Sequence, residues 1–297
     1  MSHDLIDVHQ AITDRIIALI EAGTDEVRLP WLRTGMSSVL PRNVASGEHY
    51  NGINILSLWA ACETKAYSTS LWGTYRQWQG LDAQVRKGEK ASLVVFYKQI
   101  EVDADPANEH DDGVRHVARA SWVFNVEQVD GYRADDDLPP LPPIERMARA
   151  EAFIGATGAA VRAGGDRAFY DRTADRIQMP DEQLFRAADP DARRQDWYAV
   201  LTHELAHWSG APHRLGREFG KRFGDQAYAM EELVAELSSA FLCAELGLTP
   251  VFRDDHAAYI SHWLGVMKGD KRAIFTAAAK ASEAARFLKK FSDAAAE

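Results

Sequence analysis

The chain has 297 residues, which is long enough for two domains that each bury a hydrophobic core. Its hydrophobic content of 46% and charged content of 26% are ordinary for a soluble globular protein, and no apolar run approaches the ~18–20 residues that span a bilayer. The net charge of −10 argues against indiscriminate binding to nucleic acid.

The N-terminal segment and the cysteines bear on location. Asp4, Asp7 and Asp14 interrupt the apolar positions near the N-terminus, which is the wrong chemistry for a secretory signal peptide. Cys62 and Cys243 lie in different halves and are interpreted as reduced, buried thiols rather than as a disulfide framework. The sequence therefore predicts a cytoplasmic protein with no membrane partner.

Apolar spacing and turn residues predict the elements of the first half. Residues 4–22 have helical periodicity, and β-branched and aromatic residues predict two strands joined by an acidic loop at 103–113. The expected elements are helices at 4–22, 53–64 and 74–80, and strands at 91–100 and 119–129.

A proline-rich segment divides the chain. Residues 138–143 contain four prolines, which fit neither a packed helix nor a sheet and favour an extended spacer. We therefore predict an N-terminal domain at 1–137, a linker at 138–143 and a C-terminal domain at 144–297. Residues 101–137 hold eleven acidic and three basic side chains, so most of the negative charge lies in one short region.

The second half is predicted to be mainly helical. Asp189 and Pro190 are typical of a helix start, and Gly210 is predicted to end that helix. The other expected elements are a helix at 144–155, a strand at 159–163, a hairpin at 168–180, and helices at 225–246, 254–268 and 271–291. The predicted fold class is α+β, with two domains.

The helix that ends at Gly210 carries the motif H-E-x-x-H at His203, Glu204 and His207. Two histidines four residues apart lie on one helix face and can share one divalent metal ion, and the intervening glutamate can take a proton from water. Zinc is the expected metal, although manganese or cobalt would accept the same ligands.

The third metal ligand has two main candidates. Glu232 and Glu236 are four residues apart on a later predicted helix, so that Glu232 would complete the site and Glu236 would orient a ligand histidine from behind. This arrangement resembles the gluzincins. The alternative is His213, because residues 203–213 also match the metzincin pattern; Glu231 or Glu236 as the ligand is a further alternative.

Such a site predicts amide hydrolysis with Glu204 as the general base. Tyr170 or Tyr228 could stabilise an oxyanion, although a structural role is the simpler interpretation of each. By analogy with zincins, the hairpin at 168–180 could offer an edge strand to an extended peptide.

The first half combines aromatic with basic residues. Residues 42–98 carry seven positive and four negative charges among many aromatic side chains. Aromatic platforms beside cationic groups are typical of single-stranded nucleic-acid binding, although most tryptophans and tyrosines in such a domain are core residues. The candidate contacts are Arg42, Trp72, Tyr75, Arg76, Arg86, Lys87 and Lys90.

Several longer stretches resemble a known family. Tyr50-Asn-Gly-Ile-Asn54, Trp72-Gly-Thr-Tyr-Arg-Gln77 and Val85-Arg-Lys-Gly-Glu-Lys90 resemble the N-terminal domain of ArdC-type antirestriction proteins, which also heads certain plasmid-encoded primases. His203-Glu-Leu-Ala-His-Trp208, Glu231-Glu-Leu-Val-Ala-Glu236 and Asp270-Lys-Arg-Ala-Ile-Phe275 resemble the zincin-like metallopeptidase domain of that family.

The resemblance covers nearly the whole chain. It implies an α/β module that binds single-stranded DNA, followed by a mainly helical, gluzincin-type domain. It also implies a conjugative-plasmid protein that protects incoming DNA from host restriction. For the peptidase-type site of such a protein, a host protein or peptide is one candidate substrate, and another role is the alternative. Two alternatives stay open: a cytosolic zinc metalloprotease whose first domain recognises a protein substrate, and a DNA-binding protein whose metal is structural.

Overall fold

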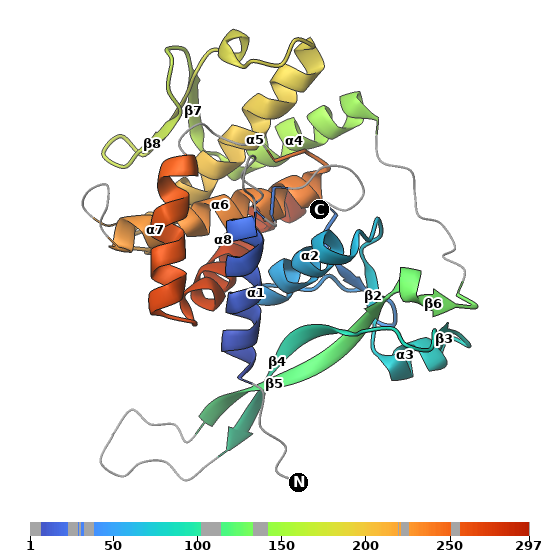
Figure 1. The fold of residues 1–297 in the computed structure, drawn as a ribbon. Coiled ribbons are helices and arrows are strands. Elements are labelled where there is room, and N and C mark those ends of the chain that lie inside the picture. The colour runs from blue at the N-terminus through green and yellow to red at the C-terminus, as the bar shows by residue number, and fades with distance from the viewer. Residues whose placement is uncertain are drawn as a thin grey trace, which may run out of the picture.

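The computed structural model describes residues 7–22, 29, 31–32, 39–101, 114–132, 142–218, 220, 226–250 and 256–296. Figure 1 shows a long curved ribbon of two strands at one end, a group of helices in the middle and a small sheet at the opposite end. The predicted acidic loop at 103–113 and most of the predicted linker, residues 138–141, lie outside the described residues.

The N-terminal part is built on a four-stranded sheet with the order β1-β2-β5-β4. β1 runs parallel to β2, whereas β5 is antiparallel to both of its neighbours. A separate antiparallel pair joins β3 to β6. The strands are β1 Arg42–Asn43, β2 Leu71–Gly73, β3 Gln84–Val85, β4 Ser92–Glu101, β5 Val114–Asn125 and β6 Val129–Asp130. The helices are α1 Val8–Ala22, α2 Ile53–Lys65 and α3 Tyr75–Gln79.

The strand predicted at 119–129 is shifted in the structure, since β5 begins at Val114 and ends at Asn125. The side chain of Asn125 accepts a hydrogen bond from the Glu127 backbone, and the Gln128 side chain accepts one from the Asn125 backbone. This reciprocal cap favours a short turn of 3₁₀ helix over further extended backbone, so the strand stops there.

Helix α2 covers the free edge of the sheet. The Asn54 side chain donates to the carbonyl of Val95 at 2.8 Å and accepts from its N–H at 2.7 Å, and the Ser57 hydroxyl donates to the carbonyl of Leu93 at 2.6 Å. β4 is an edge strand, so these side chains replace the hydrogen bonds that a further strand would provide. They also hold α2 in register with β4.

Among its described residues, the C-terminal part contains a three-stranded sheet of order β7-β9-β8 and five α-helices. The Asp189 side chain accepts from the backbone N–H of Ala192 at 2.9 Å, which confirms Asp189 as the N-cap of α5. The strands are β7 Ala160–Ala163, β8 Phe169–Asp171 and β9 Arg176–Met179. The helices are α4 Pro143–Thr157, α5 Pro190–Ser209, α6 Gln226–Leu246, α7 His256–Gly269 and α8 Ala273–Ala296.

The larger hydrophobic core contains residues from both sides of the predicted linker. Trp59 of α2 contacts Phe241 of α6 with ring centroids 5.8 Å apart, and Ile12 and Ile16 of α1 belong to the same cluster as Trp263 of α7. A second core joins α4, α5 and β9 to α6 and α8. Helices α6 and α8 therefore serve both cores, while the domain boundary at 138–143 stays a prediction. None of the described helices is both long enough and apolar enough to cross a bilayer.

We predict that replacing Asn54 with leucine, which has the same number and branching of side-chain heavy atoms, lowers the free energy of unfolding by about 2–4 kcal/mol. The change leaves the buried N–H and carbonyl of Val95 without partners. Urea unfolding followed by circular dichroism measures the effect. Asn51→Ala, at an exposed position just before α2, serves as the control and should change stability by no more than about 0.5 kcal/mol. Equal stability of the two variants would contradict the edge role of Asn54.

Candidate metal centre and nucleic-acid surface

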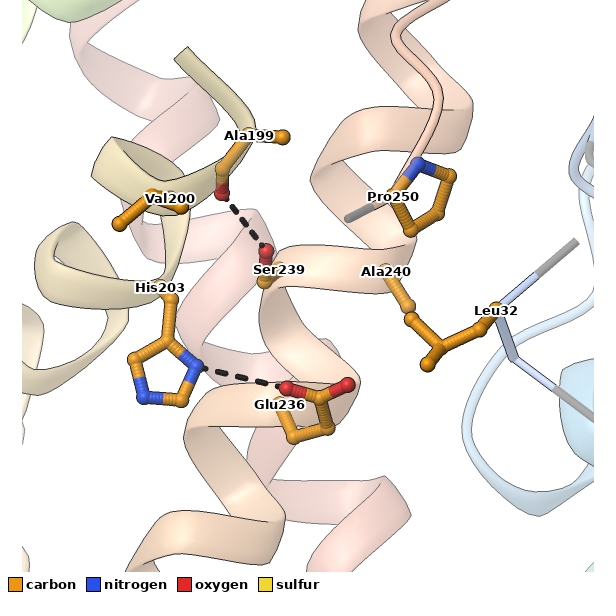
Figure 2. A pocket seen from close by; sticks show the side chains of 8 residues that line it. All are labelled: Leu32, Ala199, Val200, His203, Glu236, Ser239, Ala240 and Pro250. Atoms are coloured by element: carbon orange, nitrogen blue, oxygen red, sulfur yellow. Dashed lines mark hydrogen bonds and ion pairs between the residues drawn. The ribbon is translucent and has the colours of Figure 1, made fainter. Parts of the chain in front are cut away.

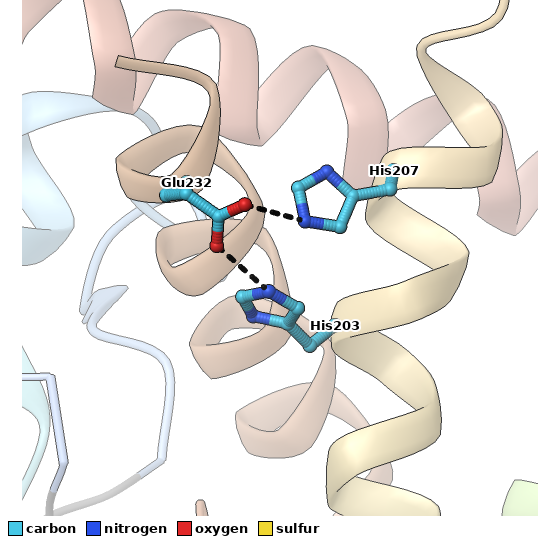
Figure 3. A group of neighbouring side chains, drawn as sticks. All are labelled: His203, His207 and Glu232. Carbon is cyan, nitrogen blue, oxygen red and sulfur yellow. Dashed lines mark ion pairs between the residues drawn. The ribbon is translucent and has the colours of Figure 1, made fainter. Parts of the chain in front are cut away.

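His203 and His207 project from α5 toward Glu232 of α6, as Figure 3 shows. The Nε2 atom of His203 lies 3.6 Å from Oε2 of Glu232, and the Nε2 atom of His207 lies 3.5 Å from Oε1. All three side chains are buried, and one ligand atom from each lies within 4.8 Å of the others. Within the described residues, this is the group of histidine, cysteine and acidic side chains with the geometry to hold a metal ion.

The spacing of these atoms fits a divalent cation. Bonds of about 2.0–2.1 Å to zinc, at tetrahedral angles, put ligand atoms about 3.3 Å apart. The observed 3.5 and 3.6 Å, which end on different oxygens of Glu232, are close to that value and longer than ordinary hydrogen bonds, so each histidine–glutamate pair leaves room for a cation between its atoms. Two imidazole nitrogens and one carboxylate suit zinc, manganese and cobalt alike.

Small and hydroxylated side chains let α5 and α6 approach each other closely. Ser239 of α6 shares a hydrogen bond of 2.7 Å with Thr202 of α5, and its hydroxyl lies 3.2 Å from the carbonyl oxygen of Ala199. Thr202 directly precedes the ligand His203, and Ser239 lies about two turns after Glu232. These contacts fix the separation at which Glu232 can reach both histidines.

Each ligand histidine has a carboxylate behind it. Nδ1 of His203 lies 3.6 Å from Glu236, the contact that Figure 2 draws, and Nδ1 of His207 lies 3.2 Å from Glu231. The contact of His207 with Glu231 is within hydrogen-bond range, and a carboxylate so placed fixes the tautomer and the orientation of a metal-binding imidazole. The longer contact of His203 with Glu236 is an electrostatic one. Sequence reasoning considered Glu231 only as an alternative ligand. Its position beside Glu232 on α6 is the signal that it reaches the second histidine.

The charges of the site are strongly coupled. Burial disfavours the charged form of His207, but the negative charge of Glu232 and the hydrogen bond to Glu231 outweigh it and raise the pKa of His207 to about 10. Burial alone would raise the pKa of Glu232, yet the positive charge of His207 and the contacts with both histidines lower it. Both shifts apply to the protein without a bound cation, and a cation that binds here would displace the proton from His207.

Glu204 and His213, the other two residues of interest in this motif, occupy different environments. Glu204 follows His203 on α5 and is buried. The His213 side chain is 62% exposed, and its Nε2 atom lies 3.3 Å from a carboxylate oxygen of Asp175. The structure thus brings Glu232, and not His213, to the two motif histidines.

The two tyrosines considered as oxyanion donors have hydrogen-bond partners within the protein. The Tyr170 hydroxyl lies 2.7 Å from Asp175 and accepts from Arg214 at 3.0 Å, while the Tyr228 hydroxyl lies 2.9 Å from that of Tyr259. Burial, together with the hydrogen bond to Asp175, raises the pKa of Tyr170 to about 12. These contacts favour the structural interpretation of both residues.

A small cavity lies beside the metal-binding group, on the side of His203 that faces Glu236 (Figure 2). Ser239 of α6 lines it with these two residues. Leu32, from the segment between α1 and β1, lines the same cavity, so the N-terminal part of the chain reaches the surroundings of the metal ligands.

The predicted nucleic-acid contacts are placed unequally. Trp72 is 0% exposed and packs edge-on against Tyr67, with ring centroids 5.9 Å apart, so it cannot stack on a base in this structure. Its position between strand neighbours on the sheet face that α2 covers explains this burial. Tyr75 is 42% exposed and remains available.

The predicted basic contacts are exposed, but one of them is engaged. Arg86 forms ion pairs with Glu89 at 3.2 Å and with Asp130 at 3.3 Å, and it also donates to the carbonyl of Glu127. It therefore has a structural role in the turn between β3 and β4. The other predicted basic contacts, all exposed, are Arg42, Arg76, Lys87 and Lys90.

Sequence reasoning missed two aromatic residues on β5. Trp122 is 46% exposed, and Phe124, half-buried, is two residues further along the strand, so both project from the same face. The Tyr75 ring lies edge-on to Phe124 with centroids 6.4 Å apart. We call Tyr75, Phe124 and Trp122 the aromatic row. The spacing of Trp122 and Phe124, two residues apart on a predicted strand, was the available signal that their side chains share one face.

Comparisons with known proteins match both parts of the chain. Residues 6–124 match the family described as the N-terminal domain of anti-restriction factor ArdC, and residues 148–280 match the zincin-like metallopeptidase family. The chain thus joins an ArdC-type N-terminal domain to a zincin-like domain, which confirms the predicted two-domain α+β class.

Solved structures and sequences agree with this class. The crystal structures of the antirestriction ArdC protein from plasmid R388 align with the chain at TM-scores of 0.77 (metal-free, 39% identical) and 0.75 (Mn(II)-bound, 38% identical). The alignments cover 97% and 96% of this chain and 98% of each ArdC chain. The chain therefore belongs to the ArdC antirestriction family.

Two kinds of curated relative are similar to the chain. An uncharacterised protein, y4eC of Sinorhizobium fredii, is 49% identical over 288 residues, which cover 95% of this chain and 91% of that protein. Two DNA primases TraC of Escherichia coli are each 34% identical, but the aligned parts span only 27% and 19% of the primases.

We predict that Glu232→Gln weakens Mn²⁺ binding by at least about 100-fold, because it removes the one anionic ligand of the group. Isothermal titration and metal content after dialysis measure the effect. Glu245→Gln is the matched control, since Glu245 lies on the same helix but pairs with Lys289 at the surface. Stoichiometric metal retained by Glu232→Gln would overturn the ligand assignment.

Proposed function

We propose that this protein binds single-stranded DNA through its N-terminal part, protects incoming plasmid DNA from host restriction, and carries a metal-dependent peptidase site. The observation that supports DNA binding best is the aromatic row of Tyr75, Phe124 and Trp122, which leaves two large rings partly open to solvent. Exposed aromatic rings, here one at the start of α3 and one on β5, can stack on unpaired bases whatever their sequence.

The surrounding charges suit a phosphate backbone. Arg76 follows Tyr75 on α3 and is exposed, and Arg42 is exposed on β1 at the edge of the same sheet. Lys87 and Lys90 extend this positive set along the turn before β4. Contacts of this kind neutralise phosphates and release counterions, so binding through them weakens as salt rises. Trp72 is left out of the proposed interface because it is buried.

The metal-binding group supports the peptidase proposal. A bound divalent cation supplies Lewis acidity toward a water molecule and a carbonyl oxygen. His203, His207 and Glu232 would hold it; the carboxylate of Glu231 orients His207, and that of Glu236 lies 3.6 Å from His203. Glu204, next to His203 on the same helix, is the group that we assign to accept the proton of the attacking water and to pass it to the leaving amine.

The identity of the cation follows from ligand chemistry only in part. Zinc is favoured by a site with two histidines and one glutamate, and the Mn(II)-bound structure of the related R388 protein makes manganese a direct alternative. A cytoplasmic location and a host protein or peptide as the peptidase substrate belong to the same proposal. Conjugation would bring the incoming single strand into the compartment that contains both the host restriction enzymes and this protein.

We predict that Trp122→Ala weakens binding to an oligo-dT strand by about 5- to 150-fold, the equivalent of one lost stacking contact of about 1–3 kcal/mol. Fluorescence anisotropy at several salt concentrations measures both the affinity and its salt slope, and the slope should not change. Phe169→Ala removes a similarly exposed ring on β8, in the other part of the chain, and should have no effect. Unchanged affinity of Trp122→Ala would argue against the aromatic row as the DNA interface.

A second variant separates peptidase activity from DNA binding. Glu204→Gln should keep Mn²⁺ binding and oligo-dT binding within about threefold, because its side chain is outside both binding sets, yet abolish cleavage of an unfolded protein such as denatured casein. Glu245→Gln should cleave normally. If Glu204→Gln still protects transferred DNA fully in cells, the peptidase site has no part in protection from restriction.

A further inference from the structure

Arg217 is a buried cation that neither the proposed DNA interface nor the metal ligands account for. It lies between α5 and α6, in the segment after Gly210, and its side chain is only 3% exposed. A guanidinium is almost never fully buried without a specific set of partners, because leaving water costs several kcal/mol. Its partners therefore indicate what it does.

Those partners connect the two helices of the metal centre. Nε of Arg217 donates to one carboxylate oxygen of Glu231 at 3.0 Å and Nη2 donates to the other at 2.9 Å. Nη1 donates to the Ser209 hydroxyl at 3.0 Å, and Nη2 also donates to the carbonyl of Ala206. The guanidinium thus grips Glu231 of α6 with a bidentate fork and is itself anchored to the last turn of α5.

Glu231 passes this restraint to a metal ligand. Its Oε1 lies 3.2 Å from Nδ1 of His207, on the same helix as Ala206 and Ser209. The contacts form a closed circuit, from α5 through Arg217 and Glu231 back to α5. A carboxylate held at both oxygens cannot rotate away from the imidazole, and a His207 that donates from Nδ1 presents the lone pair of Nε2 to the cation.

We propose that Arg217 is a positioning residue of the metal centre, which acts through Glu231 to orient His207 toward the bound cation. The inference rests on the proposed metal site and adds Arg217 as a residue that holds the carboxylate behind a ligand histidine. It also predicts an asymmetry between the two histidines. His203 has Glu236 at the longer distance of 3.6 Å, whereas His207 is restrained by the whole circuit.

Arg214 provides a matched comparison three residues away. Its side chain is also nearly buried, at 9% exposed, and it too grips a carboxylate, that of Asp175. Asp175, however, lies in the turn between β8 and β9, and Arg214 also donates to Tyr170 of β8. Arg214 fastens the small sheet to the end of α5 without contacting the carboxylates behind the ligands.

The test compares metal binding by Arg217→Met and Arg214→Met in the full-length protein. We expect Arg217→Met to bind Co²⁺ and Mn²⁺ about 10- to 100-fold more weakly, the range for losing a group that supports a ligand, and Arg214→Met to stay within about threefold. The visible absorption of bound Co²⁺ reports ligand geometry and should change only for Arg217→Met. Circular dichroism and thermal unfolding establish that both variants are folded.

A double-mutant cycle separates positioning from general support. Glu231→Gln alone should weaken Co²⁺ binding by a similar factor, and Glu231→Gln combined with Arg217→Met should be no weaker than Glu231→Gln alone, because Arg217 acts through that carboxylate. This comparison also decides the matter if Arg217→Met alone does not fold, since the double variant leaves no buried charge unpaired.

Two results would overturn the inference. One is a folded Arg217→Met that binds Co²⁺ as tightly, and with the same spectrum, as the unchanged protein. The other is a double variant whose loss is the product of the two single losses. Failure of the unchanged protein to bind any Co²⁺ or Mn²⁺ would instead overturn the metal site itself, and with it the role of Arg217. The titration of the unchanged protein distinguishes this outcome from the other two.

Discussion

The contact between α5 and α6 is the constraint on which the rest of the structure depends. Four glutamates at this interface, Glu204, Glu231, Glu232 and Glu236, are each less than a tenth exposed. Burying carboxyl groups so close together in their charged form is strongly unfavourable unless cations lie among them. Arg217 offsets part of the charge, and a divalent ion held by His203, His207 and Glu232 would offset more. The same positive charges that let α5 and α6 pack together therefore also determine the chemistry of the site.

Helix α6 connects the metal centre to the rest of the fold. One side presents Glu232 and Glu236 to α5, while Leu233, Leu237 and Phe241 pack into the core that α1 and α2 share. Since α2 is in turn held to the edge of β4 by hydrogen bonds from Asn54, a continuous series of packed elements runs from the ribbon to the metal ligands. The two regions that match separate family models thus share one hydrophobic core.

The sequence predicted what depends on local periodicity. The four-residue spacing of His203 and His207 and the position of Glu232 on a later helix follow from 3.6 residues per turn, and the structure brings these residues together. Long-range features were out of reach. Whether Trp72 or Trp122 faces solvent depends on which side of the sheet α2 covers, and residue spacing does not record that. The role of Arg217 depends on how the segment after α5 folds back between two helices, which no motif encodes.

The long helix α8 has a consequence for how the chain is made. Its first half places Ala277, Ala278 and Ala281 in the core shared with α1 and α2, and Leu288 in its second half belongs to the other core. While a ribosome is still producing the preceding segments, neither core can close, and the apolar surfaces of α2 and α6 stay open to water. Closure of either core therefore has to wait until α8 has been synthesised.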